Sequence, residues 1–250
     1  KGFPTIAEIG VFEFLGGTTW KPLEGHFGIF PMIVGSIYVT AGAIILGVPI
    51  GILCAVFMAR FCPKRLYKIL KPAVDLLAGI PSILYGYFAL MVIVPAMQNI
   101  FGGSGKGILT ASILLAIMIL PTIIGVAESA LRAVPESYYE GALALGATHE
   151  RSVFFTILPA AKSGILAGVI LGIGRAIGET MAVVYIAGNQ PVLPDSILSG
   201  VRTMTANIVL EMGYAADGIH RNALIATAVV LFVFILIINL SFSLLRRRND

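Results

Sequence analysis

The chain has 250 residues, of which 58% are hydrophobic and 12% are charged, and its formal net charge is +4. A soluble domain has about 25% charged residues, so this composition excludes a water-soluble globule, a disordered segment and a nucleic-acid-binding domain. The composition is that of a chain whose main solvent is lipid. The two cysteines are too few for a disulfide framework or a four-cysteine metal site.

Five stretches are long and apolar enough to cross a bilayer, which takes about 20 mostly apolar residues per helix. None of them alternates with the two-residue period of a barrel strand. Several contain proline, which packed membrane helices tolerate. The sequence therefore predicts an all-α, polytopic membrane helix bundle. The predicted spans cover residues 30–59, 73–97, 108–127, 163–187 and 223–245.

The basic residues are distributed unequally between the connections, and connections rich in lysine and arginine stay in the cytoplasm. Most of the 17 basic residues lie in segments 60–72, 128–162 and 246–248. These segments and the C-terminus are therefore predicted to face the cytoplasm. Residues 1–29 are then an external, interfacial segment, and residues 30–250 form the transmembrane domain.

The longest predicted cytoplasmic connection, loop 128–162, has the signals of a folded element. Pro135 stands where a helix can begin, Glu136 favours its first turn, and Gly146 can end it in a left-handed turn. Its apolar stripe consists of Tyr138, Ala142 and Leu145. A short helix across the inner face of the membrane is expected, and its stripe suits either a groove on another protein or lipid headgroups.

A single cation, Arg175, lies within the predicted span 163–187, about 18 Å from the start of the helix and near the middle of the bilayer. A charge at that depth costs between about 2.5 and about 10 kcal/mol or more, so the side chain must face protein or water instead of lipid. Glu179 follows four residues later, a spacing that brings both charged groups onto one helix face.

The same face continues through Gly164, Gly168 and Gly172, and small residues let a neighbouring helix approach closely. Two interpretations of the pair formed by Arg175 and Glu179 remain. It is either a polar patch lining a pore, where the guanidinium binds an anion that Glu179 keeps from binding tightly, or an internal ion pair that fixes helix packing. We favour the pore and predict that Arg175 and Glu179 are translocation residues.

Other polar residues give weaker signals. Asp195 is a candidate N-cap of a helix over residues 196–210, within which Arg202 could attract an anion. Asp75 is interpreted as a partner of nearby lysine or arginine. The three histidines have no spacing that would join them into a metal site, and they are interpreted as bystanders; they are His26, His149 and His220.

Loop 128–162 and several other segments resemble a known family. The pattern Glu140-Gly-Ala-x3-Gly146-x11-Leu158-Pro159 resembles the EAA loop of the permease subunits of bacterial ABC importers. Segments 79–86, 174–183 and 188–189 resemble the PstC-type permeases of the phosphate importer, and the match runs through nearly all of the chain. The fold implied is that of a type I (MetI-like) importer permease. Because that family usually has six spans, the resemblance also implies that one N-terminal helix is absent here.

The resemblance implies a multi-pass permease subunit of an ATP-driven phosphate importer in the bacterial inner membrane, without catalytic residues, cofactor or metal. Residues 136–150 would be the coupling helix that enters a cleft of the ATPase subunit. The residues implied in ATPase coupling are Glu140, Gly146, Leu158 and Pro159. The implied partners are a homologous PstA-like permease, two PstB-like ATPase subunits and an extracytoplasmic PstS-like phosphate-binding protein.

Three alternatives stay open. The chain is a permease for another oxyanion, such as molybdate or sulfate, which Arg175 would equally attract. It is a proton-coupled secondary carrier that uses Glu179 as its relay, or it is a membrane scaffold that transports nothing. The pattern from Glu140 to Pro159 argues against the last two, because neither needs a docking element.

Overall fold

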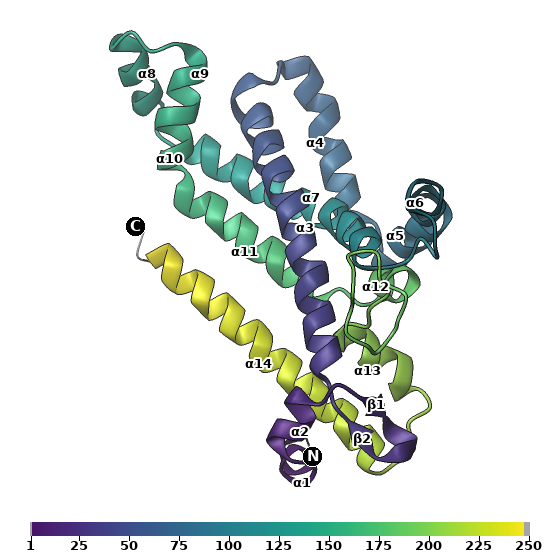
Figure 1. Ribbon diagram of the computed structural model, residues 1–250. Helices are drawn as coiled ribbons and strands as arrows, with labels where there is room; N and C mark the ends of the chain where they lie inside the picture. Colours follow the sequence, from purple (N-terminus) through teal and green to yellow (C-terminus); the bar gives the residue numbers. More distant parts are fainter. Residues whose placement is uncertain (1, 248–250) are drawn as a thin grey trace. The chain divides into compact units, whose positions relative to one another are not determined.

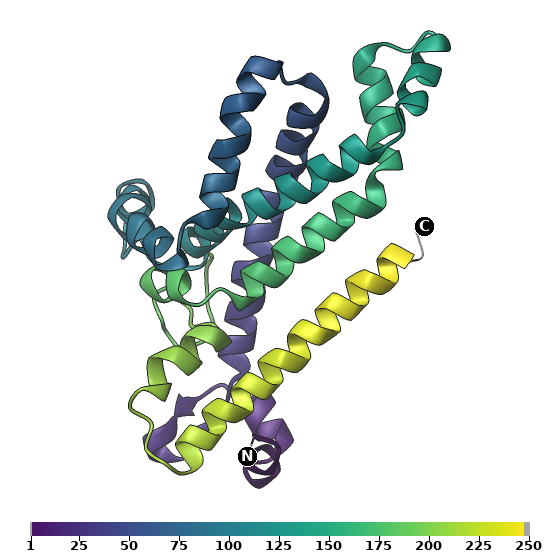
Figure 2. The same ribbon diagram turned by 180° about the vertical axis from the view of Figure 1, so that it is seen from behind.

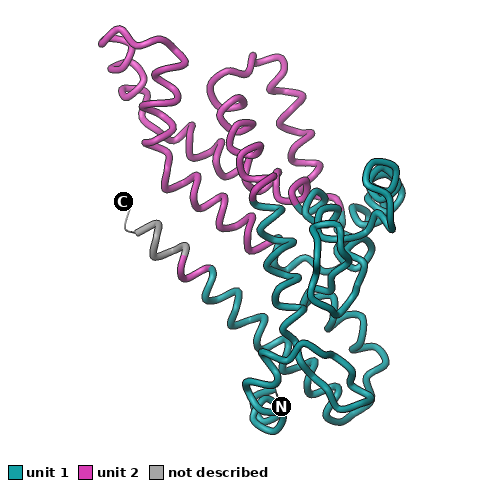
Figure 3. The backbone as a smooth tube through the Cα atoms, viewed as in Figure 1, with its two compact units in different colours: residues 1–44, 81–115, 176–238 teal, residues 45–80, 116–175, 239–250 magenta. Residues whose placement is uncertain are grey.

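A computed structural model describes the backbone of residues 2–247 and the side chains of residues 2–241. The chain is mostly helical, with one short antiparallel hairpin in which Trp20 of β1 (Trp20–Lys21) pairs with Phe27 of β2 (His26–Phe27) (Figure 1). It divides into two compact units, coloured separately in Figure 3. Unit 1 comprises residues 1–44, 81–115 and 176–238, and unit 2 comprises residues 45–80, 116–175 and 239–250.

Unit 1 is built around a core of large apolar side chains that includes Phe14, Trp20 and Met204. Both views place α1 and α2 beside the first turns of α14 (Figures 1 and 2). A side chain at Gly2 would meet Val229 of α14, so this contact is close. The elements of the unit are α1 (Gly2–Ile9), α2 (Val11–Gly16), the hairpin with the 3-10 turn η1 (Pro22–Glu24), the first part of α3 (Phe30–Val56), α5 (Ser82–Phe88), the π-helix η3 (Ala89–Ile93), α6 (Val94–Phe101), the first part of α7 (Ile108–Ala133), α12 (Met181–Ile186), α13 (Met204–Met212) and most of α14 (Ile219–Arg247).

Unit 2 has its own core, in which Val56, Leu131, Val153 and Ile157 are buried. The elements of the unit are the end of α3, the π-helix η2 (Phe57–Phe61), α4 (Lys64–Gly79), the end of α7, α8 (Glu136–Ala144), α9 (His149–Ser152), the π-helix η4 (Val153–Ile157), α10 (Leu158–Ala160), most of α11 (Lys162–Gly178) and the end of α14.

The glycine face of α11 packs on α7 in unit 2. A Cβ atom added at Gly168 would lie 3.1 Å from Val126, one at Gly172 would lie 3.0 Å from Ile123, and one at Gly164 would collide with the Cβ of Ala130. The predicted close approach of a neighbouring helix is therefore confirmed, and these glycines line a helix–helix contact.

The prediction of an all-α bundle with several apolar spans is confirmed. Within the part of the chain that the structure describes, four helices are long and apolar enough to cross a membrane, and the bent pair His149–Ala160 and Lys162–Gly178, with an angle of 69°, would be a fifth. The four are Phe30–Phe61, Ser82–Phe101, Ile108–Ala133 and Ile219–Ser241. The fold prediction rested on hydropathy, which identifies such helices well because lipid leaves the backbone few alternatives.

Two span boundaries were predicted wrongly. The predicted span 73–97 begins instead at Ser82, because Pro81 holds the preceding Ile80 in an extended conformation that ends α4. The predicted span 163–187 is not continuous, since α11 ends at Gly178 and α12 starts only at Met181.

The helix expected over residues 196–210 is also shorter. α13 begins at Met204, and Thr203 takes the N-cap position that was predicted for Asp195, with its side chain accepting the N–H of Ala206 at 3.2 Å. The five residues that precede Val201 form turns instead of helix.

Candidate coupling loop and translocation residues

Helix α8 begins and ends where the loop's proline and glycine predict. Pro135 is its extended N-cap residue, and Gly146 has φ 86°, a left-handed conformation that glycine adopts freely. The chain turns there because the N–H groups of Gly146 and Ala147 donate to the carbonyls of Leu143 and Ala142. The helix therefore stops at Ala144, and the expected single helix over residues 136–150 is too long.

After the turn, α9 is held back against α8. The Tyr139 hydroxyl lies 2.8 Å from Nδ1 of His149, and the ring centroid of His149 lies 4.7 Å from that of Phe61 in η2. The α9 N-terminus is capped by Thr148, whose hydroxyl accepts the N–H of Arg151. His149, interpreted from the sequence as a bystander, is thus a packing residue of this loop.

The residues predicted for ATPase coupling are distributed over the two ends of this segment. Glu140 and Gly146 are exposed on α8 and its turn, whereas Leu158 is half-buried beside the unit 2 core and Pro159 is exposed at the start of α10. The structure does not gather them into one constellation. Glu140 and Gly146 instead lie on the exposed surface of the loop, and Leu158 and Pro159 lie at the base that supports it.

The apolar residues of α8 face outward. Leu145 is 91% exposed and Tyr138 is 53% exposed, and Ala142 between them is half-buried. A groove of about 310 Å³ runs beside Tyr138, lined by small residues of α7, α10 and α11 such as Ala130, Ala160 and Gly164. This loop therefore presents an apolar surface with an adjacent hollow.

Arg175 lies in the last turn of α11 and is half-buried. It is the only charged residue of that helix besides its first residue, Lys162. Among the described residues of unit 2, no carboxylate forms an ion pair with Arg175. Its charge is therefore not neutralised within its own unit.

Glu179 lies beyond the end of α11. Its Oε1 accepts the N–H of Ala182 at 3.2 Å, which satisfies one of the free donors at the start of α12. Its backbone carbonyl accepts the hydroxyl of Thr205 at 3.0 Å. The prediction that Glu179 continues the helical face of Arg175 is therefore wrong, because the carboxylate caps a new helix instead of extending the old one.

Sequence reasoning missed three hydroxyl residues near Glu179. Ser36 and Thr40 of α3 and Thr203 line a pocket of about 10 Å³ next to Glu179, which is the space of one water molecule. The signal was present, since Ser36 and Thr40 lie one helical turn apart in an otherwise apolar span. In this structure the pocket is too small for a tetrahedral oxyanion.

Comparison with known proteins adds independent findings to this geometry. Residues 47–250 match the family "Binding-protein-dependent transport system inner membrane component". The "Probable ABC transporter permease protein YqgH" of Bacillus subtilis is 38% identical over 95% of this chain and 80% of that protein. The "Phosphate transport system permease protein PstC" of Mesorhizobium japonicum is 35% identical over 91% of this chain and 76% of that protein.

The fold is similar to that of solved transporters at low sequence identity. A chain of the MetNI methionine ABC transporter, in inward-facing conformations, superposes with a TM-score of 0.71 at 18% identity, covering 93% of this chain and all of that chain. A chain of a bacterial alginate ABC transporter superposes with a TM-score of 0.67 at 16% identity, covering 98% of this chain and 88% of that chain. By sequence and fold together, this chain belongs to the family of binding-protein-dependent transport system inner membrane components.

Proposed function

We propose that this chain is the PstC-like, membrane-spanning permease subunit of an ATP-driven phosphate importer. It forms the translocation pathway together with a homologous PstA-like permease. Several relatives at 34–35% identity are named phosphate transport permeases, which supports phosphate as the substrate. The chain is a transport component, and ATP hydrolysis belongs to partner subunits.

The observation that carries the proposal is Arg175, an intramembrane cation without a neutralising carboxylate among the described residues of its own unit. An unpaired charge in a membrane helix is costly, so such residues mark substrate pathways. A guanidinium presents planar donors that match the oxygens of phosphate. We therefore place the phosphate pathway at the end of α11.

Glu179 limits how long phosphate stays. Its carboxylate follows Arg175 in the chain and repels an anion, so the pathway attracts phosphate without trapping it. Conduction requires binding that is favourable enough for entry and weak enough for release. The small pocket beside Glu179 corresponds to a closed pathway in this proposal, and the transport cycle opens it.

Helix α8 transmits the work of ATP hydrolysis. Its exposed Tyr138 and Leu145, with the groove beside them, fit a cleft on the ATPase subunit better than a lipid surface, because the groove adds a shape that lipid headgroups do not require. The coupling residues Glu140, Gly146, Leu158 and Pro159 form and support this surface. Loop 128–162 and the C-terminus face the cytoplasm, and a PstS-like binding protein delivers phosphate from the other side.

Reconstitution tests the proposal. The chain is assembled in vesicles with the second permease, two PstB-like ATPase subunits and the binding protein, and entry of labelled phosphate is measured with and without ATP. We expect uptake only from the complete complex with ATP, and its abolition by Arg175→Ala while the subunits still co-purify. The matched control is Lys162→Ala, which removes the other cation of α11 from an exposed position and leaves uptake intact.

Each alternative predicts a different outcome of the same assay. Inhibition of uptake by excess sulfate or molybdate, with little inhibition by phosphate, would assign the chain to another oxyanion. Transport by the purified chain alone, lost when the proton gradient is collapsed, would make it a secondary carrier. Normal uptake by the Arg175→Ala complex would remove the pathway from α11.

A further inference from the structure

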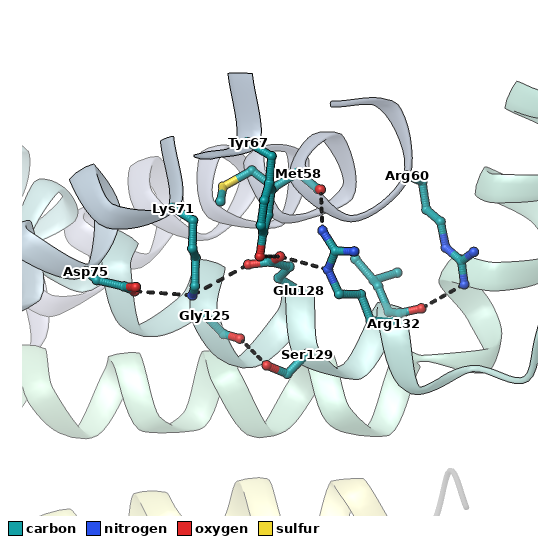
Figure 4. A network of polar contacts seen from close by, with 10 residues as sticks. Met58, Arg60, Tyr67, Lys71, Asp75, Gly125, Glu128, Ser129 and Arg132 are labelled. Atoms are coloured by element: carbon teal, nitrogen blue, oxygen red, sulfur yellow. Dashed lines mark hydrogen bonds and ion pairs between the residues drawn. The ribbon is translucent and has the colours of Figure 1, made fainter. Parts of the chain in front are cut away.

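Two arginines exchange hydrogen bonds between η2 and α7, each at a carbonyl that a proline has left without a donor (Figure 4). The carbonyl of Met58 would accept the N–H of residue 63 in a π-helix, but Pro63 has none. Arg132 of α7 donates to it at 2.9 Å. This π-helical turn is therefore closed by a side chain of another helix.

The second hydrogen bond runs in the opposite direction, from η2 to a carbonyl of α7. The carbonyl of Leu131 would accept the N–H of residue 135, which is Pro135. Arg60 of η2 donates to that carbonyl at 3.1 Å. Prolines that end the two helices thus create the acceptors that fasten them to each other.

Glu128 is the centre of the same contacts. Its side chain is 3% exposed, yet it carries a carboxylate, and a buried charge must be paired. Oε1 accepts the hydroxyl of Tyr67 at 2.7 Å and Nε of Arg132 at 2.9 Å, and Oε2 lies 3.6 Å from Nζ of Lys71 (Figure 4). We call Arg60, Tyr67, Lys71, Glu128 and Arg132 the Glu128 cluster.

The side of the cluster that faces α4 is fixed from several directions. Lys71 also bonds Asp75 at 3.2 Å, which confirms the interpretation of Asp75 as a partner of a nearby cation. The guanidinium of Arg132 lies 4.7 Å from the centroid of the Tyr67 ring. The hydrogen bond to Glu128 raises the pKa of Tyr67, so its phenol stays protonated and remains a donor.

The cluster is continuous with the start of α8. Arg60 forms an ion pair at 2.9 Å with Glu136, the first residue of α8. Only Val134 and Pro135 separate the end of α7 from that helix. A displacement of α8 therefore acts both on α7, through the chain, and on η2, through Arg60.

We infer that Glu128 is a positioning residue that makes α8, the end of α7, η2 and α4 move as one body, so that motion of the coupling helix reaches the α3–α4 hairpin. The inference rests on the proposed function of α8. Glu128 touches neither phosphate nor ATPase in this scheme and acts through Arg132, Tyr67 and Lys71. Its loss should uncouple ATP hydrolysis from transport.

The experiment compares phosphate uptake with ATP hydrolysis in the complete reconstituted complex. Glu128→Gln keeps the size of the side chain and an oxygen acceptor but removes the charge that holds Arg132 and Lys71. We expect phosphate taken up per ATP hydrolysed to fall by about 2- to 30-fold, the range by which residues along a coupling route alter coupling. A merely structural residue would lower the amount of assembled complex and leave this ratio unchanged.

Two matched control variants show how the ratio of phosphate uptake to ATP hydrolysis responds to a merely structural change. Glu211→Gln removes an equally buried carboxylate from unit 1, and Ser129→Ala removes a hydroxyl next to Glu128 that bonds only the carbonyl of Gly125 within α7. Both should keep the wild-type ratio. If Glu128→Gln also keeps it, or if Glu211→Gln lowers it equally, the positioning role is wrong.

A second variant decides the matter if the Glu128→Gln complex does not assemble. Tyr67→Phe removes one hydrogen bond of the cluster and no charge, and it should lower the ratio in the same direction by a smaller factor. An unchanged ratio in Tyr67→Phe would then overturn the inference. Failure of the proposed function looks different, because the wild-type complex itself would show no ATP-dependent phosphate uptake.

Discussion

The two units each bury one glutamate, and both glutamates fasten elements that are far apart in the sequence. Glu128 of unit 2 is 3% exposed and Glu211 of unit 1 is 5% exposed. Each carboxylate accepts one hydrogen bond from an arginine and another from the polar hydrogen of an aromatic side chain. The common design shows how an apolar chain with few charged residues uses them inside the protein, where each contact is strong.

The partners of the two glutamates differ in kind. Glu128 contacts neighbouring helices, whereas Glu211 of α13 joins strand β1, the segment before α13 and the start of α14: Nε1 of Trp20 at 2.8 Å, the guanidinium of Arg202 at 2.7 Å and Nε2 of His220 at 3.0 Å. We call these four residues the Glu211 cluster. Arg202, expected from the sequence to attract an anion, is therefore committed to a carboxylate, and His220 is not a bystander. The Glu128 cluster adjoins the helix that is proposed to move, and the Glu211 cluster joins the hairpin to α13 and α14.

Removal of either buried carboxylate should lower the free energy of unfolding more than the other changes considered. Glu211→Ala leaves Arg202, which is 16% exposed, near a site built for an ion pair, and breaking a buried pair costs about 3–5 kcal/mol. Glu128→Ala should cost less than this, because Arg132 is 46% exposed and remains hydrated. Thermal unfolding of the purified chain in detergent measures the loss of stability. Ser129→Ala is the surface control, with an expected change within about 0.5 kcal/mol. Equal stability of Glu211→Ala and the wild type would show that its contacts contribute little.

The next largest loss of stability is expected when the aromatic hydrogen-bond donors are replaced. Tyr67→Phe and Trp20→Phe each remove one hydrogen bond to a carboxylate, which contributes about 1.5–3 kcal/mol. Trp20→Phe should cost more than Tyr67→Phe, because the indole is also buried in the unit 1 core and the smaller ring leaves a void. Unfolding curves of the two variants rank them, and the reverse order would contradict the packing described for Trp20.

The same contrast explains which features could be predicted from the sequence. The apolar helices and the α8 boundaries follow from hydropathy and from Pro135 and Gly146, which act on their immediate neighbours. The break at Glu179 could not be foreseen, since the Thr205 hydroxyl that holds its carbonyl is 26 residues away. The centre at Glu128 was missed for the same reason, because Tyr67 lies 61 residues from it.

Part of the Glu128 cluster did leave a local signal. Pro63 and Pro135 each remove a backbone donor near the end of a helix, and an arginine stands close in sequence to each of the carbonyls left over. A search for carbonyls that lack a donor because a proline follows would have paired η2 with α7. Such a search needs an assumption about which helices are neighbours, which hydropathy does not supply.

A smaller effect is expected at the exposed edge of the Glu128 cluster. The Glu136 side chain is 58% exposed, so its ion pair with Arg60 is screened by water and should contribute about 0.2–1 kcal/mol. A double-mutant cycle of Arg60→Gln and Glu136→Gln, measured by thermal unfolding, gives this coupling energy. It should decrease as salt is added. A coupling energy as large as that of the Glu128–Arg132 pair would mean that the edge is as well shielded as the centre.

The smallest expected effect concerns the pKa values of two tyrosines, one next to each buried glutamate, whose shifts have different causes. Tyr67 and Tyr214 both have pKa values raised above 10.0, but the hydrogen bond to Glu128 is the main cause for Tyr67, and burial is the main cause for Tyr214. Because the neutral phenol is favoured in the folded chain, each contributes stability that is fully present below about pH 10 and is lost as the pH rises through the folded pKa.

Alkaline absorbance titrations, each compared with the matching Tyr→Phe variant, isolate the two phenols. Glu128→Gln should return the pKa of Tyr67 toward its ordinary value, because the charge that strengthens its hydrogen bond is gone. Glu211→Gln should leave most of the shift of Tyr214, because Glu211 is not the main cause of that shift. Equal responses would mean that the two carboxylates act on their tyrosines in the same way, and the difference in cause between the two pKa shifts would fail.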